Sequence, residues 1–294
     1  TAMEGVININ KPLGMTSHDV VGCLRRILDI KRIGHTGTLD PEAAGVLPIC
    51  VGKATKISEL LTAARKQYVA EVCLGVVTDT LDASGVVLRT APVDVSEKEI
   101  RQCLQSFIGE ISQIPPMYSA IKIDGKKLYE LAREGKEVER EPRLITIFDI
   151  KLLHTDLDKH KFTIRVDCSK GTYIRTLCQD IGESLGCGAH MSALTRTRSG
   201  RFFIEDSITL EEVEAKFGRG ETDFIQSVSD ALPDCPKIVV AERNAWRIRN
   251  GIVAEVSGLV EGKSYCVYDE HGDLLSISTQ KDGKLKMTKS FYGK

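Results

Sequence analysis

Residues 161–185 carry the pattern that most restricts the fold, because the spacing of apolar side chains changes within them from that of a strand to that of a helix. Apolar and polar residues alternate from Phe162 to Cys168, which is typical of a strand with one buried face. Gly171 ends this strand. After Tyr173 the apolar residues recur at helical spacing: Ile174, Leu177, Cys178, Ile181 and Leu185. The segment therefore predicts a strand that leads directly into a helix.

Similar signals along the rest of the chain indicate the fold class. A helix start is expected at Thr16, with Asp19 in the first turn, and Ser96 with Glu99 forms a capping box for another helix. A further helix is expected over 54–65. Strands are expected over 5–9, 67–77 and 85–89. Because few strands and helices alternate as βαβ units, the sequence predicts an α+β protein with a mixed, largely antiparallel sheet.

The stretch Pro233-Asp234-Cys235-Pro236 is the clearest boundary in the chain. We predict one unit over 3–233, with an excursion from the main sheet near 90–150, and a second unit over 236–294. The second unit is expected to hold one helix and several short strands: a helix over 242–250 and strands at 237–240 and near 253–256, 263–268, 273–278 and 284–291.

The cysteines and the apolar residues exclude several classes of protein. Nine cysteines occur singly, with no Cys-x-x-Cys pair and no Cys/His cluster, so neither a zinc site nor a disulfide framework is indicated. No run of about 18 apolar residues is present, so membrane spanning is not supported. No N-terminal apolar run precedes Lys11, so secretion is not supported either. We expect a cytoplasmic protein without a metal site.

The balance of charge limits how the chain could bind nucleic acid. The formal net charge is −1, so a surface that binds phosphates would require the basic residues to be segregated from the acidic ones. Short basic runs could supply such a surface or could simply be solvated: Arg25, Arg26, Lys31, Arg32, Lys122, Lys126, Lys127, Arg196, Arg198 and Arg201.

A glycine-rich loop, Gly34-His35-Thr36-Gly37-Thr38-Leu39-Asp40-Pro41, holds the strongest candidate for chemistry. Its glycines allow tight turns and the close approach of a ligand, and Pro41 biases Asp40 toward an extended conformation. A carboxylate held in this way suits nucleophilic or acid–base work. The alternative is that Asp40 only organises a turn.

Six segments in order carry a resemblance to a known family. Besides the Asp40 loop they are Lys11-Pro12-Leu13-Gly14-Met15-Thr16-Ser17, Lys66-Gln67-Tyr68, Thr78-Asp79-Thr80-Leu81-Asp82-Ala83-Ser84-Gly85, Pro115-Pro116-Met117-Tyr118-Ser119-Ala120 and Cys168-Ser169-Lys170-Gly171-Thr172-Tyr173-Ile174-Arg175-Thr176-Leu177. Gly186-Cys187-Gly188-Ala189-His190 follows them. Together these motifs span residues 4–200, and the chain resembles the TruB family, the tRNA pseudouridine(55) synthases, of bacterial type.

The resemblance implies a largely antiparallel sheet with the active cleft across its middle. It also implies that uridine is isomerised to pseudouridine in the T loop of tRNA, without a cofactor, after the target base is flipped out of the loop. Asp40 matches the catalytic nucleophile of the family. Three routes stay open for it: attack on C1′ of the ribose, attack on C6 of the base, or removal of the 2′ proton to give a glycal.

The other site residues are likewise carried over from the resemblance. Arg175 matches the arginine that pairs with the aspartate and keeps it ionised. Tyr68 matches the tyrosine that packs on the base, and is the candidate for assisting loss of the C5 proton. Tyr173 and Leu194 match the lining of the uracil pocket. Without the motifs, Tyr68 and Tyr173 would be interpreted as core aromatics, and Arg175 as a solvated residue or part of a structural ion pair.

Two more residues are expected to bind the substrate. His35 matches the residue that fills the space left by the flipped base, and we do not assign it as a base. Lys11 either contacts phosphate or supports the Asp40 loop.

The layout of 236–294 resembles a PUA domain, a small RNA-binding β-barrel, and the alternative is a stabilising barrel without RNA contact. The expected partner is the tRNA T arm, bound by a monomer without a guide RNA or a membrane. One rival is the related guide-dependent catalytic subunit of archaea and eukaryotes. The other is a non-catalytic protein that refolds tRNA.

Overall fold

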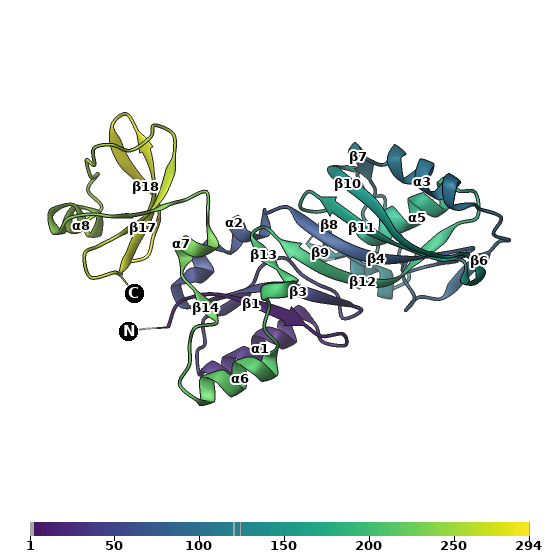
Figure 1. Ribbon diagram of the computed structural model, residues 1–294, viewed down its shortest axis with the longest axis horizontal. Coiled ribbons are helices and arrows are strands. Elements are labelled where there is room, and N and C mark those ends of the chain that lie inside the picture. The colour runs from purple at the N-terminus through teal and green to yellow at the C-terminus, as the bar shows by residue number, and fades with distance from the viewer. Residues whose placement is uncertain (1–2, 120, 124, 294) are drawn as a thin grey trace.

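A ten-stranded sheet forms the centre of the computed structural model, which describes residues 3–119, 121–123 and 125–293 (Figure 1). Eight strands follow each other across it in the order β14 (Ile225–Gln226), β1 (Gly5–Lys11), β3 (Ala43–Val51), β12 (Ala189–Ser199), β4 (Lys66–Leu74), β11 (Lys161–Cys168), β10 (Arg143–Asp156) and β7 (Gly109–Gln113). β2 (Ile33–His35) pairs with β3, and β13 (Phe202–Phe203) pairs with β12.

One parallel pair in this sheet brings distant segments together, since β12 runs parallel to β3 and the other pairs are antiparallel. Arg196 on β12 lies opposite Gly45 on β3 and, on its other side, opposite Tyr68 on β4. Gly45 has a φ of 109°, and an added Cβ would lie 2.2 Å from the carbonyl oxygen of Arg196. A side chain at position 45 would therefore force β3 and β12 apart.

Helices cover the two halves of the sheet. α1 (Ser17–Leu28) and α6 (Leu210–Gly218) pack on the half formed by β1 and β3, and α3 (Glu97–Ser106) and α5 (Ile174–Ser184) pack on the half formed by β4, β11 and β10 (Figure 1). The predicted capping residues Thr16 and Ser96 begin α1 and α3, each with a reciprocal capping box. The predicted helix over 54–65 is in fact a 3-10 helix, Gly52–Ile57, followed by the short α2 (Ser58–Thr62).

These observations confirm the fold class as mixed α+β with a large, mostly antiparallel sheet. The strand predicted before Gly171 is β11, which has alternating burial, and the helix after it is α5. Several central strands carried no clear signal, including β3 and β12.

The segment between β4 and β10 leaves the main sheet and returns to it only at β7, which pairs with β10. It holds the hairpin of β5 (Val76–Thr78) and β6 (Val87–Thr90), then α3 and β7, and then β8 (Lys122–Ile123), β9 (Lys126–Lys127) and α4 (Leu128–Arg133). Ala120, the last residue of the Pro115–Ala120 motif, lies outside the described residues. A short 3-10 helix over Leu157–Lys159 connects β10 to β11, and another over Ile204–Asp206 connects β13 to α6.

The C-terminal residues form a separate four-stranded sheet with one helix. Its order is β15 (Lys237–Val239), β16 (Ser264–Tyr268), β17 (Leu274–Lys281) and β18 (Lys284–Ser290), and α8 (Glu242–Arg249) packs beside it. The sheet is open, so the predicted barrel is not confirmed. The strand expected near 253–256 is reduced to one bridge, Ala254 to Leu285, in a segment where Gly251, Gly258 and Gly262 all have positive φ.

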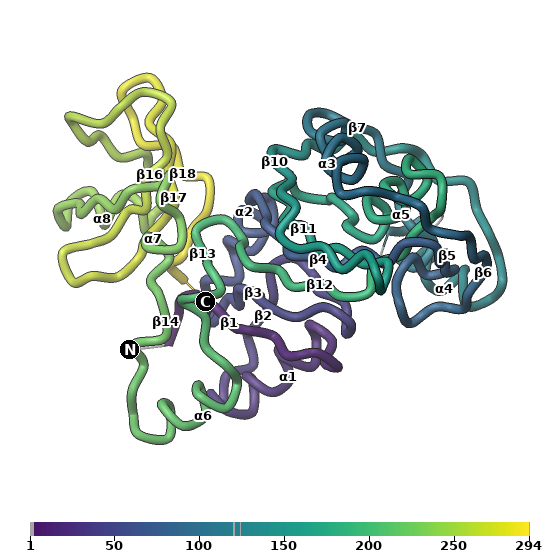
Figure 2. The backbone as a smooth tube through the Cα atoms, turned by 45° about the vertical axis from the view of Figure 1, so that its right-hand side comes forward, coloured from purple at the N-terminus to yellow at the C-terminus, as the bar shows by residue number. Residues whose placement is uncertain are grey.

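The C-terminal sheet shares a hydrophobic core with the ten-stranded sheet. Phe291, which is fully buried, packs in one cluster with residues of both parts: Val6, Val46, Cys50, Ala54, Ile57, Leu61, Phe202, Val228, Ala231, Cys266, Tyr268, Leu274 and Ile277. Val228 and Ala231 belong to α7 (Val228–Ala231), which lies at the junction in both views (Figure 2). Lys56 Nζ also donates to the Ser290 carbonyl at 2.6 Å. The C-terminal sheet is thus docked by apolar packing, not only tethered by its linker.

Candidate active site

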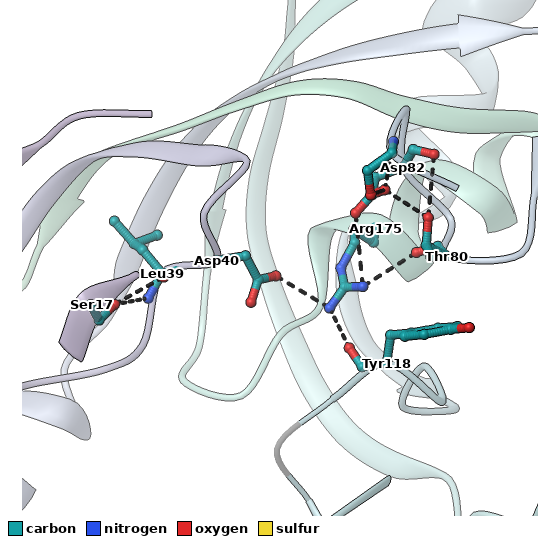
Figure 3. A network of polar contacts seen from close by, with 8 residues as sticks. Ser17, Leu39, Asp40, Thr80, Asp82, Tyr118 and Arg175 are labelled. Atoms are coloured by element: carbon teal, nitrogen blue, oxygen red, sulfur yellow. Dashed lines mark hydrogen bonds and ion pairs between the residues drawn. The ribbon is translucent and has the colours of Figure 1, made fainter. Parts of the chain in front are cut away.

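The loop that carries Asp40 is held at its base by the start of α1. Ser17 Oγ donates to the Leu39 carbonyl at 2.9 Å and accepts from the Leu39 N–H at 2.8 Å (Figure 3). The Ala43 N–H donates to the Asp40 carbonyl at 3.0 Å, where β3 begins. Hydrogen bonds therefore fix Leu39, the residue before Asp40, and the backbone carbonyl of Asp40, while the Asp40 side chain stays 54% exposed.

Arg175 joins the Asp40 loop to α5. A terminal nitrogen of its guanidinium lies 3.3 Å from the Asp40 carboxylate, and the same nitrogen donates to the Tyr118 carbonyl at 2.8 Å. The other terminal nitrogen donates to the Thr80 carbonyl at 3.2 Å (Figure 3). Because the Arg175 side chain is only 9% exposed, these partners hold it in one orientation before any substrate arrives.

A second carboxylate, Asp82, lies on the other side of Arg175, with 3.9 Å between the nearest oxygen and nitrogen (Figure 3). Its other oxygen accepts from Thr80 Oγ1 at 2.7 Å, from Ser84 Oγ at 2.6 Å and from the Ser84 N–H at 3.0 Å. The Thr78–Gly85 motif thus builds a rigid loop that faces the guanidinium. Asp82 belongs to a motif that carries the family resemblance, but it was not predicted as a site residue.

Five of the predicted site residues line one cleft of about 580 Å³: Asp40, Tyr68, Tyr173, Arg175 and Leu194. They come from four separate segments, which meet because β3, β12 and β4 are neighbours in the middle of the sheet. Gln113, which is buried, fixes the backbone of Tyr173. Its side-chain amide accepts from the Tyr173 N–H at 2.9 Å and donates to the Tyr173 carbonyl at 3.2 Å.

Arg196 also lines the cleft and was not predicted as a site residue. It is 1% exposed, and it donates from Nε to the Val46 carbonyl at 2.8 Å and from a terminal nitrogen to the Gly37 carbonyl at 2.9 Å. One guanidinium therefore holds both flanks of the Asp40 loop. Its place in the sequence was misleading, because Arg196 stands in a basic run with Arg198 and Arg201, which was interpreted as a phosphate-binding surface or as solvated residues.

Burial shifts the pKa values of two further side chains in the cleft. It raises the pKa of the Tyr68 phenol, and the nearby charge of Arg196 acts in the opposite direction. It lowers the pKa of Lys66 to about 8, with Arg196 adding to that change. The Lys66 ammonium donates to the Thr62 carbonyl at 2.9 Å, so it supports the turn before β4.

Lys11 and His35 do not line this cleft. Lys11 is fully buried, burial lowers its pKa, and its ammonium donates to the carbonyls of Pro12 at 2.8 Å and Met15 at 2.7 Å. This placement favours support of the neighbouring loop over contact with phosphate. His35 ends β2, burial lowers its pKa, and its Nδ1 has no hydrogen-bond partner within the described part of the chain.

Two general findings come from the described residues. No three His, Cys, Asp or Glu side chains among them gather in an arrangement that could hold a metal ion. None of the helices in the described part is long and apolar enough to cross a membrane.

Comparison with known proteins places this chain among the pseudouridine synthases. Residues 25–174 match the TruB family pseudouridylate synthase N-terminal domain, and residues 175–232 match the tRNA pseudouridylate synthase B C-terminal domain. The chain belongs to the TruB family. The predicted resemblance to this family is thereby confirmed.

Relatives match over nearly the whole chain. The chain is 50% identical to tRNA pseudouridine synthase B of Bacillus anthracis over 283 residues. This alignment covers 94% of this chain and 92% of the relative. The chain is also 50% identical over 274 residues to the protein of that name from Alkaliphilus oremlandii, covering 91% and 90%.

Solved structures give a similar result. A Cbf5–Nop10–Gar1 complex contains a chain with a TM-score of 0.72 and 30% identity, covering 99% of this chain and 84% of that one. A chain from an H/ACA RNP bound to a substrate RNA containing 2′-deoxyuridine has a TM-score of 0.72 and 28% identity, covering 98% and 85%.

Proposed function

We propose that this protein is an isomerase that converts uridine to pseudouridine in tRNA, at position 55 in the T loop. One observation carries the proposal: the Asp40 carboxylate, half-exposed in the cleft, lies 3.3 Å from the buried Arg175 guanidinium. The family membership and the 50% identity to tRNA pseudouridine synthase B proteins support the same activity. The reaction breaks the bond from C1′ to N1, joins C1′ to C5, and moves a proton from C5 to solvent while N1 gains one.

In this proposal Asp40 is the nucleophile or base, and Arg175 pairs with its carboxylate and aims it into the cleft. Electrostatic contacts of this kind act before the reaction starts and cost little reorganisation. Tyr68 packs on the base and is the candidate for assisting loss of the C5 proton. Burial raises the pKa of its phenol and so disfavours the phenolate, which means that a role as proton acceptor would depend on the opposing effect of the nearby Arg196 charge. Tyr173 and Leu194 enclose the uracil. The three routes for Asp40 remain open.

The target uridine has to leave the folded loop before it can reach Asp40. Flipping costs on the order of a few kcal/mol, which stacking in the cleft and contacts with the remaining loop have to offset. In the proposal His35 fills the space left by the base, as a neutral ring that stacks and accepts or donates one hydrogen bond. Lys11 supports the protein segment Pro12–Met15 through its hydrogen bonds to the carbonyls of these two residues.

We propose that the units are 3–233 for catalysis and 236–294 for binding RNA in the manner of a PUA domain. The exposed Trp246 on α8, with Arg243 one turn before it, offers a surface on which an unpaired base could stack. We further propose a cytoplasmic monomer that needs no guide RNA. The solved relatives come from a Cbf5–Nop10–Gar1 complex and an H/ACA RNP, but the 50% identical relatives are tRNA pseudouridine synthase B proteins.

The test uses unmodified tRNA labelled with tritium at C5 of uridine, incubated with the purified protein alone. Wild-type protein should release tritium to water, and mapping should place pseudouridine at one T-loop position. Asp40→Asn should release none while its dissociation constant for tRNA stays within about twofold, because the amide keeps the shape of the carboxylate. The exposed Asp94→Asn is the matched control and should react like wild type.

Turnover by Asp40→Asn would falsify the catalytic role. Binding and refolding of tRNA without tritium release by the wild-type protein would favour the non-catalytic alternative. Activity that appears only when a guide RNA and partner proteins are added would favour the guide-dependent alternative.

A further inference from the structure

A second groove, of about 470 Å³, lies beside α2 where the linker from α7 toward the C-terminal sheet crosses the catalytic unit. Its floor is apolar and is formed by residues of α2, β13 and the linker: Leu60, Leu61, Ala63, Phe202, Ala231 and Leu232. The groove shares no lining residue with the catalytic cleft. None of the roles proposed above uses it.

Three arginines, Arg65, Arg198 and Arg201, line the groove. The guanidinium of Arg65 lies 3.9 Å from the centre of the Phe148 ring, and that of Arg198 lies 4.7 Å from the centre of the Phe203 ring. Stacking of this kind fixes the plane of a guanidinium and leaves its edge N–H groups free to donate. Arg201 is exposed and has no hydrogen-bond or ion-pair partner among the described residues.

The nearby acidic groups leave the groove positively charged. Asp167 is paired with Arg65, and Asp234 is the carboxylate among the residues that line the groove. Arg198 donates from Nε to the Gly200 carbonyl, which is neutral, so two guanidinium charges face one free carboxylate. For a chain with a net charge of −1, such a local excess is the segregation that binding to nucleic acid requires.

The groove and the catalytic cleft are the two sides of one turn. Thr62 and Lys66 line the cleft, while Ala64 and Arg65, between them in the chain, line the groove. α2 lies between the ten-stranded sheet and the C-terminal sheet (Figure 2). A nucleic acid whose loop enters the cleft and whose stem runs past α2 would meet these arginines. An A-form stem presents phosphates and 2′-hydroxyls along its whole length, whatever its sequence.

We propose that this groove binds the sugar–phosphate backbone of the stem that carries the target loop, with Arg198 and Arg201 contacting phosphates. The inference rests on the proposed function, since it assumes that an RNA loop occupies the cleft. Phosphate contacts position an RNA without reading its sequence, so the groove would set affinity and register and leave the chemical step unchanged.

The test compares Arg201→Glu with Lys98→Glu, which makes the same change of charge at an exposed position on α3. Both are made in Asp40→Asn protein and in wild type, and unchanged thermal unfolding checks their folding. Binding to a T-arm hairpin with its full stem is measured from about 50 to 200 mM salt. Arg201→Glu should weaken binding about tenfold and reduce the slope of log K against log salt by about one, and Lys98→Glu should do neither.

A hairpin with its stem cut to two base pairs should bind Arg201→Glu and wild type equally. The single-turnover rate at saturating full-length RNA should also be the same. Equal affinity and salt slope for Arg201→Glu and Lys98→Glu on the full stem would overturn the proposal, and so would an equal loss on the short stem. If wild type binds RNA but releases no tritium, the proposed function fails, whereas a stem-dependent loss in Arg201→Glu would still support the groove.

Discussion

Arg196 should hold the Asp40 loop in place, and replacing it should separate the cost in stability from the cost in rate. Its guanidinium bridges the Gly37 and Val46 carbonyls, which lie on either side of Asp40 in the chain. Arg196→Lys keeps the positive charge but offers a single ammonium, which cannot reach both carbonyls with the geometry of a guanidinium fork. Arg196→Met removes the charge and both hydrogen bonds.

The magnitudes follow from the contacts. A hydrogen bond from a charged donor contributes about 1.5–3 kcal/mol, so Arg196→Lys should lower the free energy of unfolding by about 2 kcal/mol. Arg196→Met leaves two carbonyls without a partner, and should cost about 4 kcal/mol. A shift of the loop by about 1 Å would misplace Asp40 and lower the rate of the chemical step by about 10²-fold in either variant.

The assay is single-turnover release of tritium at saturating tRNA, together with urea unfolding of each variant. Arg196→Lys should lose rate while its dissociation constant for tRNA changes by less than about threefold, because Arg196 is only 1% exposed and its hydrogen bonds go to carbonyls of the protein. The exposed Arg101→Lys on α3 serves as the control. A stable Arg196→Lys protein with the wild-type rate would refute the positioning role, and so would a loss of rate explained entirely by weaker binding.

Two further predictions use other features of the chain. Burial lowers the pKa of Lys66 from 10.5 to about 8, so the unfolded chain binds the extra proton between these values and stability rises with pH there. Relative to Lys66→Met, the wild type should gain about 1.4 kcal/mol per pH unit from pH 8 to 10, and a pH-independent difference in urea unfolding would contradict the shift. Trp246→Ala, 57% exposed in the wild type, should weaken tRNA binding about tenfold without lowering the melting temperature. Val260→Ala, at a residue 60% exposed in the same unit, is the control, and equal affinities for both variants would argue for a purely structural C-terminal unit.

Local patterns predicted the elements that depend on local physics. The alternation in β11, the capping boxes at Thr16 and Ser96, and the helix after Tyr173 follow from spacing and hydrogen bonds within a few residues. β3 was missed for a physical reason. It is apolar without alternation because it is buried on both faces, and it contains Gly45 and Pro48, which ordinarily count against a central strand.

The site residues also divide into those that a local motif reveals and those that only contacts distant in the chain reveal. Asp40 and Arg175 could be proposed because they stand in distinctive motifs, and the structure places their charged groups within 3.3 Å. Arg196 and Gln113 could not be proposed as site residues. The two hydrogen-bond partners of Arg196 lie 150 and 159 residues away in the chain, and the partner of Gln113 lies 60 residues away. Only the parallel pairing of β12 with β3 shows that Arg196 faces the catalytic loop and not solvent. A basic run in a sequence can therefore hold one buried positioning residue beside two that are open to ligand.

The shared core changes how the C-terminal unit should be tested. Cys50, Ala54 and Ile57 are completely buried against that unit, and Phe291 fills the same cluster. Deleting residues 236–294 would expose this apolar surface directly beside α2, which separates the catalytic cleft from the arginine-lined groove. A deletion would therefore weaken RNA binding by loosening the catalytic unit even if the C-terminal surface never touched RNA. Exposed substitutions such as Trp246→Ala leave the core intact, so they report on contact with RNA alone.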